Sequence, residues 1–103
     1  MKIYNANEIT INKLSENFLE VITPKSAVTF PVNRNVSVSW DHDGGHEKIQ
    51  RPEHDRVLIM YGHSNLCFED RMKYMCFNIY LKVGDGKIVY NELRKYIPTP
   101  PLG

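Results

Sequence analysis

The chain has 103 residues, of which 42% are hydrophobic and 24% are charged, and its formal net charge is +1. This length and composition are typical of one globular domain spanning 1–103, and they exclude a disordered or fibrous chain. The near-neutral charge argues against nucleic acid as a partner. No apolar run is long enough for a membrane helix, and no signal peptide follows Met1, so we expect a cytoplasmic protein.

The first third of the chain predicts short strands, with one alternative. Ile9 and Ile11 alternate with polar residues, and Phe18–Thr23 is strand-like, so two strands are expected there. The apolar residues between 8 and 22 also fit a helical stripe, which would make the protein α+β. Ala27–Val32 is expected to form an edge strand because prolines bracket it.

Two further strands are expected in the middle of the sequence. In Val36–Trp40 the apolar side chains alternate with serine, which predicts a core face that includes Trp40. Val57–Tyr61 is a continuous apolar run of strand length. It predicts a central strand that is buried on both faces.

The strongest alternation lies at Lys73–Val83, where every odd position is apolar. We expect a half-buried strand there, followed by a hairpin turn at Asp85-Gly86 and a second strand at Lys87–Tyr90. Asn91–Tyr96 suggests one closing helical turn, and 98–103 forms a proline-rich tail.

Together these signals predict a mainly β fold. We expect a small antiparallel sandwich or barrel-like domain with seven or eight short strands and at most one short helix.

The stretch 41–56 is the most informative for function. It contains five acidic residues, three basic residues and three histidines, and it connects two predicted strands as a polar loop. Loops of this length in compact domains are usually functional or disordered. Imidazole and carboxylate groups bind divalent metals, so His42, His46 and His54 are candidate ligands for zinc or a similar ion. The alternative is a solvated loop that binds no metal.

Weaker signals lie further along the chain. His63 and Cys67 together with Cys76 are compatible with a zinc site, but they lack the close cysteine pairing of such sites, and free cysteines are the simpler reading. Tyr74 and Tyr80 share the polar face of the 73–83 strand with basic residues. Such a face could stack single-stranded nucleic acid or form an ordinary solvated surface.

The sequence favours a small interaction module of the inhibitor or accessory type, of the kind that phages and mobile elements encode, without a cofactor. It would recognise a protein or a small ligand through the 41–56 loop and an exposed sheet face. A metal-dependent hydrolase or isomerase is the alternative, and a homo-oligomer is expected because small domains often cover edge strands by pairing. The residues predicted to form the binding surface are Trp40, Asp41, His42, Asp43, His46, Glu47, His54, His63, Tyr74 and Tyr80.

Overall fold

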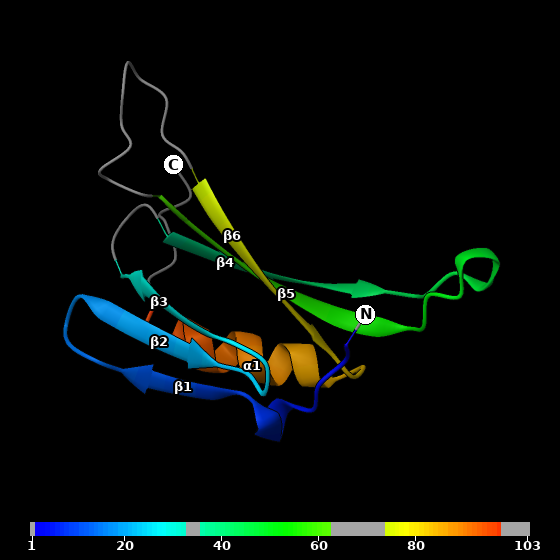
Figure 1. Cartoon of the computed structure of the whole chain (residues 1–103), viewed down its shortest axis with the longest axis horizontal. Helices are drawn as coiled ribbons and strands as arrows, with labels where there is room; N and C mark the ends of the chain where they lie inside the picture. The colour runs from blue at the N-terminus through cyan, green and yellow to red at the C-terminus, as the bar shows by residue number, and fades with distance from the viewer. Residues whose placement is uncertain (1, 33–35, 63–73, 98–103) are drawn as a thin grey trace, which may run out of the picture.

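The computed structural model describes residues 2–32, 36–62 and 74–97, which form two antiparallel sheets and one α-helix (Figure 1). The first sheet has the order β1-β2-β3, and the second has the order β4-β5-β6. The prediction of a mainly β fold is confirmed. The described residues form six strands rather than seven or eight, and the two sheets do not close into a barrel. The strands are β1 (Thr10–Lys13), β2 (Phe18–Ile22), β3 (Ala27–Pro31), β4 (Val36–Asp43), β5 (His54–Gly62) and β6 (Tyr74–Leu81).

The N-terminal segment forms strands β1 and β2, so the helical alternative over 8–22 is wrong. Leu19 and Val21 of β2 are fully buried, whereas Glu20 between them is only half-buried. This period of two matches a strand that has one face on the core. β3 is an edge strand of the first sheet, as its prolines predict.

The second sheet has an inner face on the core and an outer face that points away from it. β5 is the central strand, as predicted, but within Val57–Tyr61 only its inner face is fully buried. Val57 and Ile59 are fully buried, whereas Leu58 and Met60 on the outer face are half-buried. The continuous apolar run therefore does not mark a strand enclosed on both faces.

The core joins both sheets to the helix. α1 (Asp85–Arg94) packs against the inner face of β4 and β5. Phe30 of the first sheet stacks on Tyr61 of the second, with ring centroids 5.6 Å apart. The buried apolar residues are Tyr4, Leu19, Val21, Phe30, Val36, Val57, Ile59, Ile79, Leu81, Val89, Leu93 and Ile97.

The expected C-terminal hairpin is replaced by a helix. Asp85-Gly86 begins α1 instead of turning a hairpin, and the predicted strand Lys87–Tyr90 is part of this helix. Val89 and Leu93 are four residues apart and both buried, so they form one helix face. The cause is a tertiary contact. Buried Asp55 accepts hydrogen bonds from the backbone N–H groups of Gly84 and Gly86, at 2.8 and 3.1 Å, and so caps the helix N-terminus from another strand.

Three predicted core side chains prove to be substantially exposed. Trp40 is 38% exposed, so the prediction that it lies buried is wrong, although its side chain hydrogen-bonds to Asp55. Met75 and Val83 lie at the two ends of the predicted 73–83 alternation, and both are about half exposed. Met75 stands next to the first residue of β6, and Val83 lies beyond its last residue, Leu81, so the alternation extends further than the buried part of the strand.

The polar segment 41–56 is loop only in its middle, because both of its ends are strand. β4 ends and β5 begins inside it, and the register pairs Asp41 with Arg56, His42 with Asp55 and Asp43 with His54. Only 44–53 connects the strands, and it contains the short 3₁₀ turn η2 (Glu47–Ile49). This connection lies at the far right of Figure 1, where the hairpin extends beyond the sheets.

The start of the chain fastens to the helix and to β6. Tyr4 pairs in parallel with Leu81, and Asp85 accepts a 2.8 Å hydrogen bond from the backbone N–H of Ala6. Ala6 begins the 3₁₀ turn η1 (Ala6–Glu8), so the carboxylate caps that turn from the helix. Over the described ranges, no helix has both the length and the apolar character needed to cross a membrane.

Gly86 should be intolerant of a side chain. A Cβ atom there would lie 2.5 Å from Cβ of Asp55 and 2.6 Å from the indole nitrogen of Trp40. We expect Gly86→Ala to lower the free energy of unfolding by about 1–3 kcal/mol, the usual cost of overpacking. Gly44→Ala is the control, because no atom lies within 4 Å of its added Cβ, and it should stay within about 0.5 kcal/mol of wild type. Urea unfolding that gives equal stabilities for the two variants would contradict this packing.

Candidate binding site

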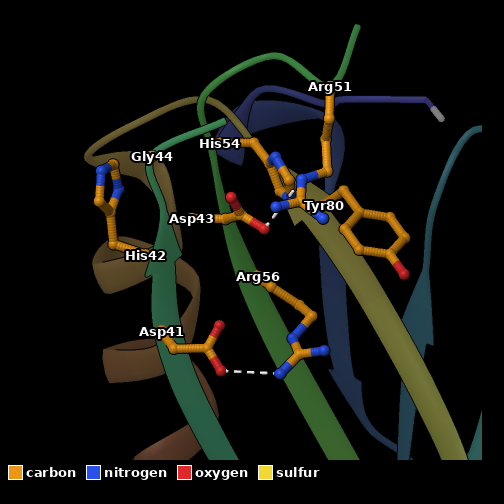
Figure 2. A pocket seen from close by; sticks show the side chains of 8 residues that line it. All are labelled: Asp41, His42, Asp43, Gly44, Arg51, His54, Arg56 and Tyr80. Carbon is orange, nitrogen blue, oxygen red and sulfur yellow. Dashed lines mark hydrogen bonds and ion pairs between the residues drawn. The ribbon is translucent and has the colours of Figure 1, made fainter. Parts of the chain in front are cut away.

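A polar pocket of about 370 Å³ lies on the outer face of the second sheet (Figure 2). All three strands of the sheet and the β4–β5 connection contribute to it. Its lining residues are Asp41, His42, Asp43, Gly44, Arg51, His54, Arg56 and Tyr80. Two arginines and two aspartates balance each other, so the pocket is polar without a large net charge.

The first ion pair of the pocket joins neighbouring strands. Arg56 of β5 lies opposite Asp41 of β4, and its Nη2 donates to the Asp41 carboxylate at 2.8 Å. The hydrogen bond and charge of Asp41 raise the pKa of Arg56, so the guanidinium stays charged. Both side chains are about half exposed, so the pair fixes the direction of the guanidinium more than it stabilises the fold.

The second ion pair joins β4 to the connection. Nε of Arg51 lies 3.2 Å from Oδ2 of Asp43, while Oδ1 of Asp43 accepts the Gly45 backbone N–H at 2.9 Å. The hydrogen bond from Gly45 and the charge of Arg51 lower the pKa of Asp43, so this carboxylate stays ionised. Backbone bonds of 2.8 and 3.0 Å between His46 and Arg51 close the turn that places the arginine.

His54 and Tyr80 form the wall between the two arginines. His54 is 2% exposed, and its Nδ1 lies 2.8 Å from the Pro52 carbonyl oxygen. A carbonyl can only accept, so Nδ1 of His54 carries a proton and donates to it. The His54 ring meets Tyr80 edge to face, with centroids 5.5 Å apart. This packing gives the pocket one rigid, partly aromatic side.

The two arginines retain unused hydrogen-bond donors. Nε of Arg51 and Nε of Arg56 are both buried, and neither has a hydrogen-bond partner among the described residues. The short distance from Arg51 to Asp43 is therefore an ion-pair contact without good hydrogen-bond geometry. Buried polar groups are almost always satisfied in folded proteins. These Nε atoms are inaccessible, but the two side chains as a whole are 37% and 41% exposed, so an external acceptor would meet the outer parts of the guanidiniums.

His42 belongs to a different arrangement on the inner face, and Figure 2 shows its ring pointing away from the other labelled side chains. Its Nδ1 lies 3.0 Å from Oδ1 of Asp55, and its Nε2 lies 3.0 Å from Oε1 of Glu53. The hydrogen bond with Asp55 is the main reason that the pKa of His42 is raised above 6.5, and the Glu53 charge adds to it. His42 therefore bridges two carboxylates that favour its protonated form.

The structure brings five of the predicted binding residues to the pocket and separates the others. Asp41, Asp43, His54 and Tyr80 share it, and His42 lines it with its ring turned away from them. Trp40 lies on the inner face, and His46 and Glu47 lie in the connection at η2. His63 and Cys67 lie outside the described residues, as does the side chain of Tyr74, and Cys76 is an exposed free cysteine.

The three histidines predicted as metal ligands are not gathered at one point. His42 and His54 sit on opposite faces of the sheet, because they are paired with Asp55 and Asp43 respectively. Within 2–32, 36–62 and 74–97, no group of three or more His, Cys, Asp or Glu side chains is arranged to hold a metal ion. The predicted metal site is therefore not supported by the residues that the structure describes.

Sequence reasoning missed Arg51 and Arg56, which supply both unused donors. Arg56 stands two residues after His54 and therefore shares its face once β5 is known to begin at His54. The spacing of two residues from His54 was therefore the signal that could have placed Arg56 at the site. No such signal exists for Arg51, because the turn at η2 positions it.

No protein-family model, curated protein or solved structure matches this chain at a meaningful level of similarity. The function must therefore be inferred from the geometry of the pocket and of the surrounding surface.

The link at His42 should make stability depend on pH. The folded pKa lies above 6.5, so the stabilising contribution is complete below that value and is lost as pH rises through the folded pKa. We expect the free energy of unfolding of wild type to decrease as the pH rises through the folded pKa of His42. In His42→Gln this decrease should be absent. His46→Gln, which changes an exposed histidine, should behave like wild type. Denaturant unfolding at a series of pH values that gives parallel curves for wild type and His42→Gln would contradict the assignment.

Proposed function

We propose that this protein is a small binding module that recognises a partner protein through the outer-face pocket, and that the pocket accepts an acidic side chain of the partner. The observation that carries the proposal is that two partly exposed arginine side chains line one pocket, each held by an aspartate. An acceptor entering the pocket would meet both guanidiniums.

A carboxylate fits these donors better than other acceptors. Each guanidinium has five N–H donors in a planar fork, and Asp41 or Asp43 engages only one edge of it. Charge-assisted, two-point hydrogen bonds from arginine to a carboxylate are stronger and more directional than bonds to a neutral acceptor. The aspartates hold the guanidiniums in place before binding, so less side-chain freedom is lost on binding.

The character of the pocket favours a protein partner over a small organic ligand. Sites for small ligands are usually enclosed and mostly apolar. Here the lining is dominated by charged and polar groups, and the pocket opens on a sheet face. Arginine and tyrosine are also among the residues that contribute most to protein–protein affinity.

A peptide titration followed by ¹H–¹⁵N NMR tests the proposal. We expect a blocked Gly-Glu-Gly tripeptide to shift the resonances of Arg51, Arg56 and Tyr80, and a blocked Gly-Gln-Gly tripeptide to shift them far less. Removing one charge-assisted hydrogen-bonding group costs about 1.5–3 kcal/mol, so Arg56→Gln and Arg51→Gln should each weaken binding about tenfold or more.

Lys48→Gln is the matched control, because it removes one positive charge from an exposed position in the connection. It should leave the affinity for the glutamate peptide nearly unchanged. The proposal fails if both peptides shift the pocket equally, or if the lysine and arginine variants lose affinity to the same extent.

A further inference from the structure

One edge of the second sheet, formed by β4, has no strand paired with it among the described residues. β4 runs from Val36 to Asp43 and pairs with β5 on one side only, since the sheet order is β4-β5-β6. No backbone hydrogen bond joins the other side of β4 to any part of the chain that the structure describes. A long, unpaired edge is a template for another strand, and proteins normally cover or disrupt it.

An apolar and aromatic surface continues from this edge onto the helix. Trp40 leaves 38% of its surface exposed, and its ring lies 6.5 Å from that of Tyr90 on α1. Arg94 donates to the Tyr90 hydroxyl at 2.7 Å and so fixes the position of that ring. The inner side of the edge thus presents an exposed tryptophan on a rigid support, which is typical of the centre of an interface.

We infer that a second copy of this chain covers the edge, with the two β4 strands antiparallel about a two-fold axis at Ser39. The sequence of β4 is complementary to itself in this register. Trp40 would lie opposite Val38 of the second copy on the inner face, which is a favourable apolar cross-strand pair. On the outer face, Asp41 would lie opposite Ser37 of the second copy.

The charges of β4 restrict the register. An axis at Asp41 would set the two Asp41 carboxylates directly opposite each other, and like charges in that position are destabilising. An axis at Ser39 opposes no like charges within Ser37–Asp41. The same surface therefore serves both copies, as a closed two-fold interface requires.

The pairing would have a consequence for the proposed binding site. The two outer faces would form one continuous six-stranded sheet, with one pocket toward each end. Each pocket includes Asp41 and Asp43, which lie on the C-terminal side of the two-fold axis at Ser39. Two identical sites on one face would let the dimer engage a bivalent partner. The dimer itself does not depend on whether the pockets bind a partner.

Light scattering coupled to size-exclusion chromatography tests the dimer with a matched pair of variants. Ser39 and Asn78 are both exposed on the outer face, in the same row across Leu58, but they belong to opposite edge strands. We expect wild type and Asn78→Lys to elute at twice the 12.0 kDa mass of the chain. Ser39→Lys would place two lysines opposite each other at the axis, so it should be a monomer.

A charge-reversal experiment removes the concern that the lysine variant merely misfolds. Ser39→Glu alone should also be monomeric, whereas an equal mixture of Ser39→Lys and Ser39→Glu should form a heterodimer. A monomeric wild type at submillimolar concentration overturns the inference and leaves the edge to a different protein. A Ser39→Lys variant that remains dimeric, or a mixture that stays monomeric, overturns it as well.

Discussion

The carboxylate of Asp55 is the contact on which the arrangement of the second sheet and the helix depends. Its side chain is 1% exposed, and it receives hydrogen bonds from the backbone of Gly84 and Gly86 and from the side chains of His42 and Trp40. Burying an unpaired carboxylate costs several kcal/mol. Because the donors come from β4 and from the start of α1, that cost is offset only when strand and helix are assembled together.

The electrostatics of Asp55 agree with this role. Burial alone would raise its pKa, but the hydrogen bonds from His42, Gly84 and Gly86 outweigh burial and lower the pKa below 3.8. The negative charge also lies at the N-terminus of α1, where the helix dipole favours it. The stabilisation from this carboxylate is therefore present above the unfolded value and is lost as pH falls through the lowered pKa.

Strand alternation separates this structural role from the proposed binding role. Asp55 points to the helix, so its neighbours His54 and Arg56 must point to the outer face. The register then places Asp41 and Tyr80 on either side of Arg56. A residue that fixes the helix on one face thereby fixes the position of the candidate site on the other.

The parts of the fold that follow from local patterns could be predicted, and the parts that depend on distant partners could not. Alternation located β1, β4 and β6, because the period of two is a property of the strand itself. The same reasoning read Asp85-Gly86 as a hairpin turn, since nothing nearby in sequence reveals that Asp55 receives its N–H groups. Trp40 was expected in the core because the sequence does not show that it stands on an edge strand.

The candidate site was predicted in part for a similar reason. Polar residues between two strands pointed to Asp41, Asp43 and His54, and an exposed sheet face pointed to Tyr80. The extension of β4 to Asp43 and of β5 back to His54 was not evident from so few apolar residues. His42 and His54 therefore seemed to belong to one loop, whereas the register sets them on opposite faces.

Amide hydrogen exchange in Asp55→Ala tests most directly whether this carboxylate fastens the helix to the sheet. Asp41→Ala, which removes an exposed carboxylate from the neighbouring strand, is the control. Protection in a folded protein reports local opening, so a lost cap should appear first in the helix. The account predicts that Gly84, Gly86 and the amides of α1 lose much more protection than those of β2 and β3 in Asp55→Ala, and that Asp41→Ala leaves them unchanged. Equal protection of α1 in Asp55→Ala and in wild type would contradict it.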